Sequence, residues 1–182
     1  MSHSEEIAAI VDKHLAKLVN AKINNIVGSV EPEMVAPSNY PQSEWQSWLP
    51  VNSTVTSDEI LEIEGRFGIK FPADYIAFLS HKHFYDLCIS EAEFCWHPIR
   101  TWRKYLTDMS FSGYPREYLI DRGWMPFANW SDWGHLCFDT TVSAENFPVG
   151  LWDHEQADIL TPKHSDFYEM LVWLDKQSDL NG

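Results

Sequence analysis

The chain has 182 residues, 45% hydrophobic and 14% aromatic, which is enough to build one packed domain. Its formal net charge of −14 argues against binding to nucleic acid or anionic lipid and would attract a basic protein. No apolar run approaches the roughly 18 residues that span a bilayer, and the acidic N-terminus is unlike a secretory signal. The expected location is therefore the cytoplasm.

The cysteines argue against a disulfide framework and against a Cys-rich zinc site. Cys88, Cys95 and Cys137 are odd in number and have no C-x-x-C spacing. Free cysteine usually packs like a small hydrophobic residue, so we expect buried, reduced thiols.

The first 44 residues are predicted to be an amphipathic helix followed by a proline-containing loop. Apolar residues recur at helical spacing from Ile7 to Ile26, and Gly28 offers a stop. Residues 29–50 contain four prolines and little periodicity, so we interpret them as a connecting loop with a possible short turn at "SEWQSWLP". This arm, residues 1–44, precedes the expected main domain, residues 45–182.

Helices and short strands follow. "TSDEILEIEGRFG" has capping-box spacing at Thr56 and Glu59 and a terminal Gly68, and "FPADYIAFLSHK" begins at a well-placed proline. Residues 84–90 and 92–96 favour strands. "HPIRTWRKYLTDM" and "PREYLIDRG" are predicted helices.

The C-terminal third changes pattern. "WMPFA", "HLCFD" and "PVGLWD" are predicted strands, and a final helix is expected from about His164 to Gln177. In "HLCFD", alternation places Leu136 and Phe138 on one face and the other three residues on the opposite face. Helices, an antiparallel meander and a closing helix indicate an α+β fold, with an antiparallel or mixed sheet packed by helices in a single domain that carries an N-terminal helical extension.

Catalysis and metal binding are weakly supported. His135, Asp139, Asp153 and His154 could converge if their strands pair, but alternation sends Asp153 and His154 to opposite faces. Cys137 and His135 form a conceivable nucleophilic pair, although an inert core thiol fits the strand better. We expect no metal, no cofactor and no catalytic residue, while a hydrolase or metal-dependent enzyme stays open as a second alternative.

Two tryptophans stand apart from the others. Trp96, Trp102, Trp124, Trp152 and Trp173 are readily placed in the core, whereas Trp130 and Trp133 flank a probable turn. Their rings either fold back over the sheet as a lid or anchor a partner, since tryptophan is enriched in interface hot spots. The partner-binding hypothesis adds the nearby carboxylates, and its residues are Trp130, Asp132, Trp133, Asp153 and Glu155.

Five stretches occur in a recognisable order: "WLP", "EIEGRFGIKFPADYIAFLS", "MPFANWSDWGHLCFD", "FPVGLWDHE" and "DFYEMLVWL". Together they resemble the SUKH superfamily over about residues 45–175. "SHKHFYD" stands where the family usually has a glycine-containing turn, and Gly134-His135 where it commonly has Gly-Asp. The positions that carry the resemblance are Glu64, Phe71, Pro72, Tyr75, Phe78, Pro126, Phe127, Gly134, Asp139, Trp152, Asp153, His154 and Phe167.

The resemblance implies an α+β fold and a non-catalytic binding role. Bacterial members are similar to cytoplasmic immunity proteins that bind and block a toxin domain, and this acidic chain would suit a basic, nuclease-like toxin. The alternative is a regulatory interaction protein like the fungal regulator of cell-wall assembly and glucan synthesis. The expected partner is thus a protein, without nucleic acid or membrane, and the oligomeric state stays open.

Overall fold

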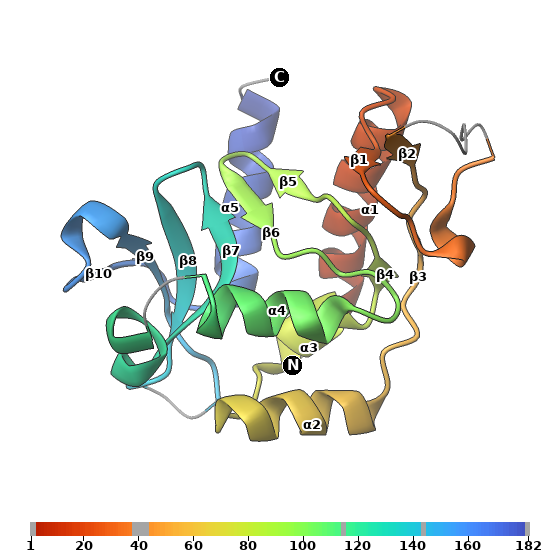
Figure 1. Ribbon diagram of the computed structural model, residues 1–182. Helices are drawn as coiled ribbons and strands as arrows, with labels where there is room; N and C mark the ends of the chain where they lie inside the picture. The colour runs from red at the N-terminus through yellow and green to blue at the C-terminus, as the bar shows by residue number, and fades with distance from the viewer. Residues whose placement is uncertain (1–2, 38–43, 114–115, 143–144, 181–182) are drawn as a thin grey trace.

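A computed structural model of the chain describes residues 3–37, 44–113, 116–142 and 145–180. The predicted α+β fold is confirmed: one six-stranded antiparallel sheet is packed by helices (Figure 1). Helix α5 (Phe167–Leu180) lies behind the sheet, and α4 (Trp102–Phe111) lies in front of its lower end. Helix α1 (Ser4–Asn20) packs on α5 and on α3 (Ala73–Leu79).

The N-terminal region differs from its prediction. Helix α1 ends at Asn20 instead of continuing to about residue 27, because Lys22 takes a left-handed backbone conformation (φ 58°) that turns the chain. Strand β1 (Asn25–Val27) therefore stands where the end of the helix was predicted. It pairs with β2 (Trp45–Ser47), which lies in the predicted loop together with a 3₁₀ turn, η1 (Pro32–Met34).

The next two helices confirm their predictions. Helix α2 (Ser57–Phe67) begins with the capping box of Thr56 and Glu59 and ends at Gly68, whose φ of 71° suits glycine. Helix α3 follows directly after Pro72. A small two-stranded sheet, β3 (Val51–Asn52) with β4 (Lys82–His83), closes this region.

The large sheet is a meander with the strand order β10-β9-β8-β7-β6-β5. The edge strand β10 was not predicted. Helix α4 begins at Trp102 instead of at Pro98 because residues 99–101 form a turn. The helix predicted at "PREYLIDRG" is instead two 3₁₀ turns, η2 (Arg116–Tyr118) and η3 (Ile120–Arg122). The strands are β5 (Cys88–Ile89), β6 (Ala92–Phe94), β7 (Trp124–Trp130), β8 (Gly134–Asp139), β9 (Val149–Asp153) and β10 (Leu160–His164).

The two faces of the sheet bury different residues, as the alternation in β8 predicted. Leu136 and Phe138 belong to the main core, whose aromatic centre joins Tyr75 to Phe138 and Phe167 at ring-centroid distances of 5.1 and 5.2 Å. Cys137 lies on the opposite face in a second cluster, with Leu119 and Trp152.

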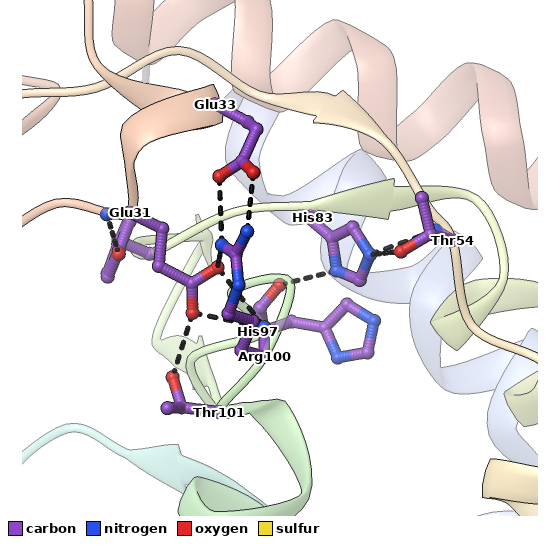
Figure 2. Close-up of polar contacts among 8 residues, drawn as sticks. Glu31, Glu33, Thr54, His83, His97, Arg100 and Thr101 are labelled. Carbon is purple, nitrogen blue, oxygen red and sulfur yellow. Dashed lines mark hydrogen bonds and ion pairs between the residues drawn. The ribbon is translucent and has the colours of Figure 1, made fainter.

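The N-terminal arm packs against the rest of the molecule and forms ion pairs with it. Ile7, Val11 and Leu15 of α1 are buried in the main core. Farther along, the Arg100 guanidinium pairs with the carboxylates of Glu31 and Glu33, as Figure 2 shows. Burial along α1 and these ion pairs join residues 3–37 of the arm to the same core as the main sheet.

Candidate functional site

The five residues of the predicted binding surface meet at one end of the sheet. Trp130 ends β7, Asp132 and Trp133 form the β7–β8 turn, and Asp153 ends β9. The turn is joined to the end of β9 because the His154 N–H donates to the Trp133 carbonyl at 3.2 Å. Glu155 follows in the 3₁₀ turn η4 (His154–Gln156), so all five lie on neighbouring segments.

The two tryptophans of this turn have different surroundings. Trp130 is half-buried, packs against the main core and stacks on Trp173 at a ring-centroid distance of 6.3 Å. Trp133 leaves 37% of its surface exposed. The prediction that Trp173 belongs to the core is wrong, because 39% of it is exposed on the side of α5 that faces Trp130.

These rings enclose a groove, which we call the tryptophan groove. Its volume is about 340 Å³. Leu136 and Leu151 are directly paired across β8 and β9, so they share one face of the sheet and form the apolar floor. The full set of lining residues is Trp130, Trp133, Leu136, Leu151, Lys163, His164 and Trp173.

Close approach of the backbone shapes one end of this groove. Gly134 pairs with Trp130 on one side and Asp153 on the other. A Cβ on Gly134 would lie 2.3 Å from the Trp152 carbonyl oxygen, so the close approach of β8 and β9 at this position requires glycine.

Carboxylates lie on the segments that flank the groove, although none of them lines it. Asp132 and Glu155 are exposed, and Asp153 is partly buried while one of its oxygens accepts a hydrogen bond from the Glu155 N–H at 2.8 Å. At the other end, Glu169 and Asp166 act electrostatically on His164. Burial is the largest influence on that ring and lowers its pKa below the usual 6.5, so His164 is neutral at pH 7.

The second face of the sheet holds the residues considered for catalysis. The Cys137 thiol is fully buried, donates to the His135 carbonyl at 3.8 Å and has a pKa raised well above its usual value by burial. Burial lowers the pKa of His135 to about 4, and its ring stacks on Trp152. A neutral thiol beside a neutral imidazole holds no ready thiolate nucleophile.

The residues considered for metal binding lie on different faces of the sheet. His135 and Asp139 share one face of β8, whereas Asp153 pairs with Gly134 and stands on the other face of the sheet. Within the residues that the structure places, no three His, Cys, Asp or Glu side chains gather closely enough to hold a metal ion.

The three cysteines are free thiols, and one of them corrects the prediction. Cys137 is buried and Cys95 half-buried, but Cys88 is exposed on the edge strand β5. Burial, together with neighbouring acidic groups, raises the pKa of Cys95 to about 12. The Cys95 thiol is therefore protonated at neutral pH.

The positions that carried the family resemblance serve the fold. Buried Glu64 accepts from the Phe71 N–H at 2.8 Å and pairs with Lys70 at 2.7 Å, which joins the end of α2 to the start of α3. The Asp139 carboxylate accepts from the Thr141 N–H and hydroxyl in a turn. The remaining motif positions that are buried are Phe71, Pro72, Tyr75, Phe78, Pro126, Phe127, Gly134, Trp152 and Phe167.

Sequence reasoning missed the second wall of the tryptophan groove. Trp173, Lys163 and His164 come from α5 and from β10, a strand whose Pro162 and exposed "TPK" hide its strand character. The sequence did hold one indication that Trp173 is not a core residue. It lies six residues after the buried Phe167, off the apolar stripe of α5.

Comparison with known proteins agrees with the fold. Within the described residues, no helix has both the length and the apolar character required to cross a membrane. A search of curated proteins finds no match. The sequence model of the SMI1 / KNR4 family (SUKH-1) matches residues 54–173, from the N-terminal side of α2 to Trp173 in α5, and this chain therefore belongs to the SMI1 / KNR4 family (SUKH-1).

Proposed function

We propose that this protein binds another protein and neutralises it, as an immunity protein does for its cognate toxin domain. The observation that carries the proposal is the surface of the β7–β8 turn, where the exposed Trp133 ring stands beside the exposed carboxylates of Asp132 and Glu155. Tight interfaces typically combine a few aromatic anchors with a rim of charge.

Charge supports a basic partner. The molecule carries a net charge of −14, and the last 52 residues hold ten acidic residues against two lysines. A toxin domain that cleaves nucleic acid needs basic residues to hold the phosphate backbone. Opposite charges would steer the two proteins together and allow association at about 10⁸ M⁻¹s⁻¹ at low salt.

The proposed role is non-catalytic. Its support is the state of the residues most suited to catalysis: Cys137 is a buried, protonated thiol, and His135 is a buried, neutral ring stacked on Trp152. Both side chains fill the second face of the sheet, where they contribute to packing.

The test begins with the reading frame immediately upstream of this one. A large secreted protein with a small variable C-terminal domain there would supply the candidate toxin. Co-expression of that domain with this chain should rescue growth, and a double variant with Asp132→Lys and Glu155→Lys should weaken rescue and slow association. Glu117→Lys, at an exposed site on η2, is the control for reversal of one acidic charge away from this turn. A toxin domain that kills equally with and without the protein refutes the pairing.

The second candidate function is regulation by protein interaction, of the cell-wall-regulator type, and its support is the family to which the chain belongs. It differs from the first in its genetic setting. An upstream frame that encodes no toxin, together with capture of a host protein that depends on Trp133, would favour regulation.

A further inference from the structure

The tryptophan groove has a composition that suits a flat cation. Two of its walls are the stacked rings of Trp130 and Trp173, and the His164 ring lies 5.2 Å from that of Trp173. The faces of indole rings attract a cation. A volume of about 340 Å³ is at the lower end for ligand pockets, which fits one long side chain better than a large ligand.

The charges around the groove have the sign that such a cation needs. Asp132, Asp153 and Glu155 stand at the turn end, and Asp166 and Glu169 at the end near His164. Only Lys163, among the residues that line the groove, carries a positive charge at neutral pH. Carboxylates on the segments that flank both ends of an apolar slot favour a cation whose flat face rests on the indoles.

We propose that the tryptophan groove binds an arginine side chain presented by a basic protein partner. Arginine fits better than lysine because its guanidinium is planar, weakly hydrated and able to stack on an aromatic face while its edge donates to carboxylates. This assignment rests on the proposed function, since that function supplies the basic partner, and it names the residue type that the partner inserts.

Removing the charge of Lys163 tests the proposal through a gain in affinity for arginine. Its ammonium group opposes a guanidinium in the same groove. Lys163 is exposed on the edge strand β10, so Lys163→Gln should leave the fold intact and tighten arginine binding about threefold. A variant that binds more tightly cannot be explained by damage to the fold.

The experiment titrates the full chain with short peptides and follows the indole N–H signals of its nine tryptophans by NMR, assigned by single substitution. The probes are acetyl-Gly-Arg-Gly-amide and the same peptide with citrulline, which is neutral and nearly the same shape, in place of arginine. The arginine peptide should shift the signals of Trp130, Trp133 and Trp173 and bind about tenfold more tightly than the citrulline peptide.

Two variants complete the design. Trp173→Ala should abolish the shifts at Trp130 and Trp133. Trp45→Ala removes a tryptophan that is 58% exposed on β2 and does not line this groove, so it should leave arginine binding unchanged. Neither ring is buried, since Trp45 is 58% exposed and Trp173 39% exposed, and urea unfolding of both variants shows whether each keeps its fold.

The proposal is overturned if the citrulline peptide binds as well as the arginine peptide, because the groove then recognises shape and not charge. It is also overturned if a neutral oligosaccharide such as maltopentaose shifts the three signals and arginine does not, or if no probe shifts them. Because these titrations need no toxin, a failure here with successful rescue by co-expression rejects only the arginine site. Arginine binding without any toxin partner rejects only the immunity role.

Discussion

Lowering the pH from 7 to 5 is expected to destabilise this protein through its buried histidines. His83 is held neutral by its contacts, because its Nε2 accepts from the Thr54 N–H at 2.9 Å while its Nδ1 donates to the His97 carbonyl at 3.0 Å (Figure 2). The His97 ring stacks on it at 5.0 Å and donates from Nε2 to the Leu79 carbonyl at 2.8 Å. Protonation of His83 would place an N–H against the N–H of Thr54.

The sign and size of the effect follow from the pKa values. Burial lowers the pKa of His97 to about 3 and that of His135 to about 4, and burial also lowers the pKa of His83. In the unfolded chain each would titrate near 6.5, so below that pH the unfolded state binds more protons and stability falls. At pH 5, His97 and His135 each cost about 2 kcal/mol, or about 4 kcal/mol together, at 1.36 kcal/mol per pKa unit.

Urea unfolding at pH 7, 6 and 5 measures this loss. His97→Gln keeps a donor for the Leu79 carbonyl but does not titrate, so the loss between pH 7 and 5 should fall by about 2 kcal/mol. His154→Gln removes an exposed histidine whose electrostatic effect is the smallest cause of the lowered pKa of His135, so it should change the loss much less than His97→Gln does. The hydrogen bond from Arg100 lowers the pKa of Glu33 to about 2. The contribution of Glu33 to stability is therefore lost only below about pH 4.5, outside this pH window. A total loss under about 1 kcal/mol, or a full loss in His97→Gln, would refute the reasoning.

Three further changes have defined outcomes in the same unfolding assay. Glu64→Ala leaves the buried Phe71 N–H without its carboxylate and should cost about 1–3 kcal/mol, whereas Glu64→Gln, which keeps an acceptor, should cost less. Gly134→Ala should cost about 1–3 kcal/mol through its clash with the Trp152 carbonyl, and an unchanged midpoint would contradict that contact. Deletion of residues 1–20 removes three buried apolar side chains worth about 1.5–3 kcal/mol each, which approaches the total stability of a domain, so a cooperative transition in the fragment would show that α1 is dispensable.

The parts of the fold that could be predicted from the sequence are those fixed by local chemistry. The capping box at Thr56 and the left-handed Gly68 act within a few residues, so they marked both ends of α2. Alternation in β8 assigned Leu136 and Cys137 to opposite faces because the pleat has a period of two.

The missed elements depend on distant partners. Strands β1 and β2 are three residues each and form because they pair with one another. No local sequence pattern predicts that pairing. Strand β10 pairs with β9 despite Pro162, which an edge strand tolerates. For the candidate site, the turn residues could be predicted, but Trp173 joins them only through the docking of α5 on the sheet.

Burial separates the residues that define the family fold from those that could choose a partner. Glu64, Tyr75 and Phe167 are all 5% exposed or less, so replacing them disturbs the core or a buried hydrogen bond. Trp133 and Glu155 lie at the surface, where substitution changes stability little. A sheet held by the first group can therefore carry different side chains at the β7–β8 turn and at η4 without refolding, and on this physical ground a family match predicts the fold of a member far better than the identity of its partner.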